Sequence, residues 1–242
     1  MTKELTVTKE NVPATTGFGG EGLEGIEQSD LVLPKLWLMQ AISKLVAEEE
    51  KFVAGNIVNS LTAELVDADN TNGPIDVVPI MMKKVWYEYE TVGNKEELSR
   101  IFDHGPTTAS LTPGPVQGTA LFLRRAIQFF VMISKEVEGG PALPAMMNFM
   151  KTNYQTGKKL ITFTVQSGML KQPIWGTAYQ FAAKKQTNDH GTFYVWDLVG
   201  KRKATADESK ASAEWYNILK ASKVQQETAS VDSTVGGDDI PF

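Results

Sequence analysis

Aromatic and basic residues alternate along residues 120–223 in a pattern that suits binding of single-stranded nucleic acid. This region carries fifteen Lys and Arg against seven Asp and Glu, a net charge of +8, in a chain whose net charge is −5. Rings stack on bases for about 1–3 kcal/mol each, and Lys and Arg between them hold the phosphates. The candidate DNA-binding residues are Phe122, Arg124, Phe130, Lys151, Tyr154, Lys158, Trp175, Tyr179, Lys184, Lys185, Tyr194, Trp196, Lys201, Arg202 and Lys203, with Trp86 from an earlier alternating segment.

Only part of this set can face solvent. One face of each strand must be buried, so we expect about half of the aromatic residues to be structural. The sequence is compatible with burial of either face of a strand. Lys184-Lys185 and Lys201-Arg202-Lys203, at the mouth ends of two expected strands, are the strongest candidates for phosphate contacts. A chance charge asymmetry between the halves of a globular protein is the alternative interpretation.

The last five residues suggest a second binding function. Residues 226–242 contain four acids and no Lys or Arg, and they end on Asp238, Asp239, Ile240, Pro241 and Phe242. Apolar residues at a disordered terminus have no core to join, so they suit a pocket on another protein, toward which the acids would steer them. We therefore expect a disordered acidic tail whose tip binds a protein partner, with an accidental acidic tail as the alternative.

Signals of catalysis, metals and membranes are weak. The chain has no Cys and only two His, and it lacks the G-x-x-x-x-G-K-[ST], H-E-x-x-H and G-x-S-x-G motifs. The neighbouring residues Asp67, Asp69 and Asn70 are typical of a turn. There is no long apolar run and no apolar signal region. We expect a cytoplasmic protein that is not an enzyme and has no cofactor, metal or membrane partner.

The elements that would position the candidate residues are mostly strands. We expect a flexible acidic arm over residues 1–30, one domain over 31–225, and the tail over 226–242. Strands are expected at 55–59, 77–82, 85–89, 119–133 and 145–151, with a hairpin of 174–185 and 192–201. A strand or short helix is expected at 31–39, and strand or helix at 154–165.

Three local details complete the pattern. Residues 94–115 are expected to be mostly loop, with one or two helical turns over 96–102. Arg125 interrupts the apolar face of the 119–133 strand, so a bulge could occur there. A helix is expected over 207–222, capped by Thr205 or Asp207.

The whole pattern resembles phage-encoded single-stranded DNA-binding proteins. The resemblance rests on the flexible arm, the interleaved aromatics, the final helix and the opening Gly22-Leu23-Glu24-Gly25-Ile26. The tip at 238–242 resembles that of bacterial single-stranded DNA-binding proteins, which implies that Phe242 is buried in a partner and its carboxylate held by an arginine. The family implies a mainly β fold with some α, an OB-fold-like barrel with flanking helices. Bacterial relatives are shorter and lack a counterpart of the first hundred residues.

The function expected from these observations is coating of single-stranded DNA in phage replication, recombination and repair, in the infected host cytoplasm. The tip would recruit replication or recombination proteins, and a homo-oligomer is left open. Two alternatives remain: a recombination mediator or single-strand annealing protein, and a phage structural or assembly protein.

Overall fold

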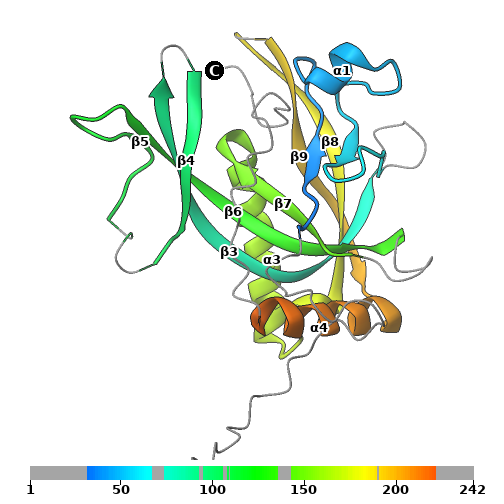
Figure 1. Cartoon of the computed structure of the whole chain (residues 1–242). Helices are drawn as coiled ribbons and strands as arrows, with labels where there is room; N and C mark the ends of the chain where they lie inside the picture. The colour runs from blue at the N-terminus through cyan, green and yellow to red at the C-terminus, as the bar shows by residue number, and fades with distance from the viewer. Residues whose placement is uncertain are drawn as a thin grey trace, which may run out of the picture.

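The computed structural model describes residues 32–66, 74–92, 95–105, 108, 110–135, 143–189 and 191–221. The arm, the tail with its tip, and the 67–73 segment with Asp67, Asp69 and Asn70 lie outside the described residues. The described chain is mainly β, and its seven-stranded antiparallel sheet curls into a half-barrel with flanking helices (Figure 1). This architecture is consistent with an OB-like barrel and confirms the expected fold class.

A long pair of central strands organises the sheet. Strands β3 and β6 pair from Val77↔Ile133 to Glu90↔Leu121. The outer edge of β3 carries β8 at one end and β4 at the other, while the outer edge of β6 carries β7 and the short β5. The strands of this sheet are β3 (Ile75–Val92), β4 (Lys95–Asp103), β5 (Gly114–Pro115), β6 (Leu121–Ile133), β7 (Ala145–Met150), β8 (Thr177–Asn188) and β9 (Gly191–Lys203).

Helices cover both faces of the central strands. Leu160 of α3 packs with Ile127, Phe129 and the other odd-numbered apolar residues of β6, whereas Leu219 of α4 packs with the even-numbered Phe130 and its neighbours. A small separate sheet joins two further strands. The remaining elements are β1 (Leu36–Leu38), α1 (Lys44–Glu48), β2 (Ile57–Asn59), η3 (Lys151–Asn153), α3 (Tyr154–Met169), η4 (Ile174–Gly176) and α4 (Ala206–Ala221).

Several expected elements are confirmed. The strands at 55–59, 119–133 and 145–151 appear as β2, β6 and β7, and the hairpin appears as β8 and β9. The 31–39 segment contains the strand β1, and residues 154–165 belong to the helix α3. The final helix is α4, where the Glu208 N–H donates to Thr205 Oγ1 and the Thr205 N–H donates to the Glu208 carboxylate, a reciprocal cap.

Two local expectations were wrong. The helical turns over 96–102 are instead part of β4, because residues 85–92 of β3 offer an edge with which this segment pairs. The register of β6 runs without interruption past Arg125, so no bulge occurs there; the shift lies in β3 between Pro79 and Met81. Proline lacks the N–H that a continuous ladder needs, which explains the irregularity at that point.

The outer edge of β9 is covered by side chains from the loop after β1, from η3 and from α3. Gln40 accepts from the Tyr194 N–H (2.8 Å) and donates to the Tyr194 carbonyl (3.0 Å). Asn153 accepts from the Trp196 N–H (2.8 Å), and the Thr156 hydroxyl donates to the Trp196 carbonyl (2.9 Å). Backbone groups that a further strand would satisfy are thus satisfied by side chains, which fixes the start of α3 against the hairpin.

We predict that Gly157→Ala destabilises the fold. A Cβ at this position of α3 would lie 2.8 Å from Cβ of Phe149, closer than packed atoms allow. The resulting overpacking should lower the free energy of unfolding by about 1–2 kcal/mol, measured by urea denaturation. The control is Gly168→Ala in the same helix, where no neighbour lies within 4 Å of the added atom. An equal effect of both substitutions would contradict the close approach of α3 and β7.

We predict that Glu208 makes the fold acid-sensitive. Hydrogen bonds from Arg202, together with the Thr205 N–H, lower the pKa of the Glu208 carboxyl from 4.5 to about 2. A lowered pKa stabilises the folded state above the unfolded pKa, and this stability is lost as pH falls from 4.5 toward 2. Glu208→Gln should cost about 2 kcal/mol at neutral pH and flatten that acid-range dependence.

The matched control for this prediction is Glu214→Gln on the exposed side of the same helix. Its unfolding free energy should follow the wild-type pH profile. Coincident profiles for the Glu208 and Glu214 variants would show that the Arg202–Glu208 pair does not set the acid dependence.

Candidate nucleic-acid interface

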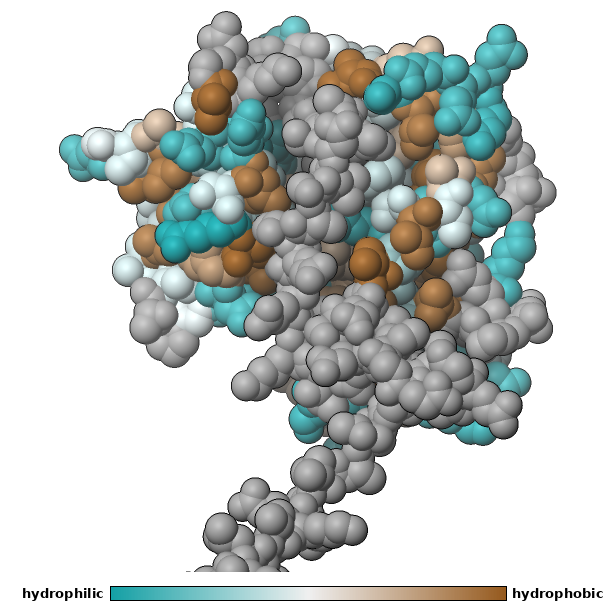
Figure 2. All heavy atoms as spheres, in the orientation of Figure 1, coloured by the Kyte–Doolittle hydropathy of each residue, from teal (hydrophilic) through white to brown (hydrophobic). Residues whose placement is uncertain are grey.

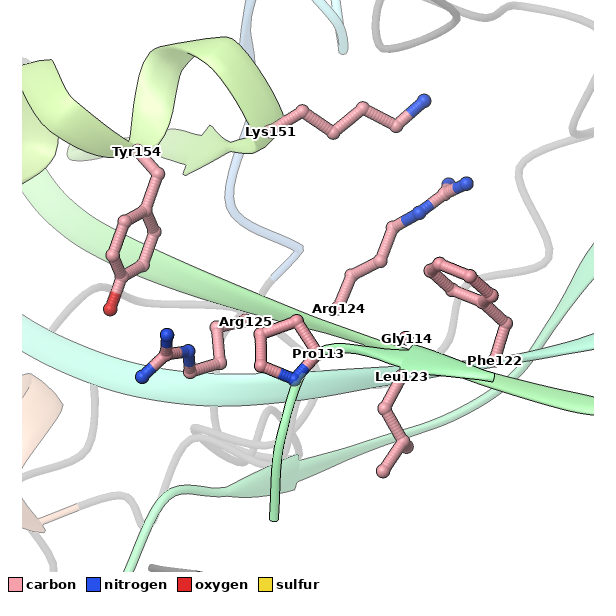
Figure 3. A pocket seen from close by; sticks show the side chains of 8 residues that line it. All are labelled: Pro113, Gly114, Phe122, Leu123, Arg124, Arg125, Lys151 and Tyr154. Carbon is pink, nitrogen blue, oxygen red and sulfur yellow. The ribbon is translucent and has the colours of Figure 1, made fainter. Parts of the chain in front are cut away.

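An open pocket of about 390 Å³ lies where β5, β6 and the start of α3 meet (Figure 3). Its volume falls in the range of small-ligand sites, which is about 300–1,000 Å³. The pocket is lined by Pro113, Gly114, Phe122, Leu123, Arg124, Arg125, Lys151 and Tyr154.

Local backbone geometry brings these residues together. Gly114 has a φ of +135°, a conformation that favours glycine, and it pairs with Leu123 to place the 113–115 segment beside β6. Lys151 has a φ of +49°, and the chain turns at this residue from β7 into η3. Tyr154 follows as the first residue of α3. Because β7 pairs with β6, the start of α3 lies near the Arg124 end of β6.

The pocket combines two rings with three cations. Phe122 and Tyr154 lie on opposite sides in Figure 3, with Arg124 between them. The guanidinium of Arg124 lies 5.1 Å from the centre of the Phe122 ring, and that of Arg125 lies 5.6 Å from the centre of the Tyr154 ring. Such contacts hold cations beside rings without neutralising the charge. Lys151 adds a third positive side chain.

Four of the sixteen predicted contact residues therefore converge: Phe122, Arg124, Lys151 and Tyr154. Arg125 next to them belongs to the same site. Pro113 and Gly114 were not among the predicted contact residues, although the Thr112-Pro113-Gly114-Pro115 run just before a strand is typical of a loop that turns back onto it. Lys158, one turn beyond Tyr154, is exposed on α3.

The prediction was wrong for four aromatic residues, because a buried ring cannot stack on a base. Their exposed fractions are 0% for Trp86, 1% for Phe130, 1% for Tyr179 and 3% for Trp196. For Phe130, Tyr179 and Trp196 the physical reason is that packed elements cover both faces of the sheet at this end, so alternation along a strand leaves neither set of rings exposed.

Each buried ring has a structural neighbour. The indole N–H of Trp86 donates to Nδ1 of His104 at 3.2 Å, and Trp196 packs edge-on against Phe181. Phe130 lies in the cluster covered by α4. Tyr179 stacks on Phe163, and burial raises the pKa of the Tyr179 hydroxyl.

Arg202 makes structural contacts within the fold rather than presenting an unpaired guanidinium to a phosphate. Its guanidinium donates to Glu208 at 2.6 and 2.9 Å, to Asp76 at 2.7 Å and to Ser134 at 3.1 Å. Hydrogen bonds to Glu208 first, and then to Asp76, raise the pKa of Arg202. The guanidinium therefore ties the start of α4 to β3 and β6.

The other predicted residues are dispersed over the β8–β9 hairpin and its surroundings. Tyr179 pairs with Lys201 whereas Lys185 pairs with Tyr194, so the two lysine clusters lie toward opposite ends of the hairpin. Lys184 lies 3.9 Å from Asp197, and Lys201 lies over the Phe163 ring. Trp175 packs on Tyr216, and Tyr194 is partly buried. Lys185 and Lys203 are exposed.

Two further properties concern only the described part of the chain. Within it, no three His, Cys, Asp or Glu side chains are grouped so that they could hold a metal ion. Its helices are all too short or too polar to span a bilayer.

Comparison with known proteins identifies the family of the chain. No curated protein and no solved structure is detectably similar to it. The family described as Pam3 phage gp34-like protein matches over residues 6–225, which is nearly the whole sequence. The match supports the phage origin that the sequence suggested. The chain therefore belongs to the Pam3 phage gp34-like protein family.

Proposed function

We propose that this phage protein binds single-stranded DNA without sequence preference and coats it during replication, recombination or repair in the infected cell. The observation that carries the proposal is the pocket in which Phe122 and Tyr154 lie among Arg124, Arg125 and Lys151. Its action is binding rather than catalysis. The acidic tip, residues 238–242, would recruit the proteins that act on the coated strand.

The ring and cation geometry suits an unpaired strand. A base that is not held in a duplex can be splayed out and stacked on Phe122 or Tyr154, and every base has a face that can stack. Arg125 is exposed beside Tyr154, so its guanidinium can contact the phosphate that follows such a base. Duplex bases are already stacked on one another and present no free face to either ring.

The charge around the start of α3 supports the same function. The sequence has no acidic residue between Glu138 and Asp189, and this interval contains the lysines Lys151, Lys158, Lys159, Lys171, Lys184 and Lys185. Lys151 lines the pocket, and Lys158 and Lys159 are exposed one to two turns along α3. A positive surface beside stacking rings is the arrangement that non-specific single-strand binding requires.

The first test is fluorescence anisotropy of a labelled oligo-dT of about thirty nucleotides, several times the usual site size of a single OB fold. The full chain should bind it tightly at low salt and more weakly at moderate salt, and a duplex competitor should not displace it. Flat anisotropy at low salt, or displacement by an equal amount of duplex, would contradict the proposed function.

We predict that Phe122→Ala and Tyr154→Ala each weaken oligo-dT binding. Loss of one stacked base, worth about 1–3 kcal/mol, corresponds to a roughly 5- to 150-fold rise in Kd. Anisotropy titration measures the change, and circular dichroism confirms that each variant is folded.

The control is Tyr216→Ala, which removes the same ring type from α4, where it packs on Trp175 away from the pocket. Its Kd should stay within about twofold of the wild-type value, because Tyr216 does not line the pocket, and circular dichroism confirms that this variant is folded. Equal losses in the Tyr154 and Tyr216 variants would remove the pocket from the binding site.

A further inference from the structure

Arg124 is engaged by three groups of its own chain. Its guanidinium lies 4.8 Å from the centre of the Tyr89 ring and 5.1 Å from the centre of the Phe122 ring. Its Nη2 donates to the Glu96 carboxylate at 2.5 Å. The Arg124 side chain is 14% exposed, whereas that of Glu96 is 40% exposed. The cation is thus held in place between rings, while its anionic partner faces solvent.

Strand register explains how this group forms. Tyr89 on β3 pairs with Phe122 on β6, and Thr91 on β3 pairs with Glu96 on β4. Because residues two apart on a strand share a face, Tyr89, Glu96, Phe122 and Arg124 all lie on the same face of this part of the sheet. The Glu96 side chain reaches across β3 to Arg124, and neighbouring strands are only about 4.8 Å apart.

A carboxylate and a phosphate compete for the same donors of a guanidinium. The carboxylate is planar and the phosphate is tetrahedral, and both accept short charge-assisted hydrogen bonds from arginine. Because the Glu96 side chain faces solvent, water can hydrate its carboxylate when it leaves Arg124, and the incoming phosphate then supplies the anionic partner of the guanidinium. The rings of Tyr89 and Phe122 would keep the guanidinium in the same place after Glu96 leaves.

We propose that Glu96 occupies the position of a nucleic-acid phosphate on Arg124, and that a backbone phosphate of the bound strand replaces it. This inference rests on the proposed function and names a residue that determines specificity at the same pocket. A neutral ligand that only fills the space between the rings has no anion to offer Arg124. Glu96 therefore makes the site selective for a ligand that brings both a ring and a phosphate.

The test compares Glu96→Gln with the wild-type chain in oligo-dT titrations over a range of salt concentrations. The amide keeps the shape of the side chain but no longer competes for Arg124, so Kd should fall about fivefold at low salt. In the Glu96→Gln variant Arg124 neutralises a phosphate without first giving up an anionic partner of its own chain. The slope of log K against the logarithm of the salt concentration should therefore become steeper by about 0.7 than in the wild-type chain.

Glu97→Gln is the matched control, because Glu97 is the next residue of β4, is also exposed, and carries the same charge. It faces away from Arg124 by strand alternation, so its Kd should stay within about twofold of the wild-type value. A second arm uses an oligo-dT with a neutral methylphosphonate backbone, on which the Glu96 variant should lose its advantage.

The outcomes separate this inference from the proposed function. If no form of the protein binds oligo-dT, the proposed function is wrong and the inference is lost with it. If the wild-type chain binds but the Glu96 and Glu97 variants behave alike, only the inference is wrong. A weaker Glu96 variant, or an equal gain on the neutral backbone, would also overturn the displacement of Glu96 by phosphate.

Discussion

The pairing of β3 with β6 is the constraint on which the rest of the structure depends. These strands stay hydrogen-bonded from Val77↔Ile133 to Glu90↔Leu121, but their outer neighbours change along the way. At one end β7 and β8 flank them, and helices α3 and α4 cover both faces, which builds the core. At the other end β4 and β5 flank them, and the residues of β6 line a pocket instead.

The short segment of residues 153–157 both covers the edge of the half-barrel at β9 and positions part of the candidate site. Asn153 and Thr156 satisfy the backbone of Trp196 on β9, and Gly157 allows α3 to approach Phe149 on β7. Tyr154 lies among these three residues in sequence, so the contacts that fix the helix also fix this ring at the pocket. A binding ring held by the fold loses little freedom when a ligand arrives, which favours affinity.

The electrostatics of the site join an acidic part of the chain to a basic part. Residues 31–119 carry twelve acids against seven bases, and β4 belongs to them, whereas β6 and η3 supply the cations of the pocket. The Glu96–Arg124 contact joins these two parts.

The sequence by itself determined the elements whose signal is local. Period-two alternation identified β6, turn residues identified the β8–β9 hairpin, and Thr205 identified the start of α4. Tertiary structure decided the features that depend on which elements pack against one another. Residues 95–103 form the strand β4 only because β3 offers an edge with which they pair, and residues 154–169 form a helix that packs over the sheet. It also decided which rings are exposed, because α3 and α4 bury Trp196 and Phe130 while Phe122 and Tyr154 lie at the open end. Alternation specifies that a strand has two faces, and only packing specifies what covers each of them.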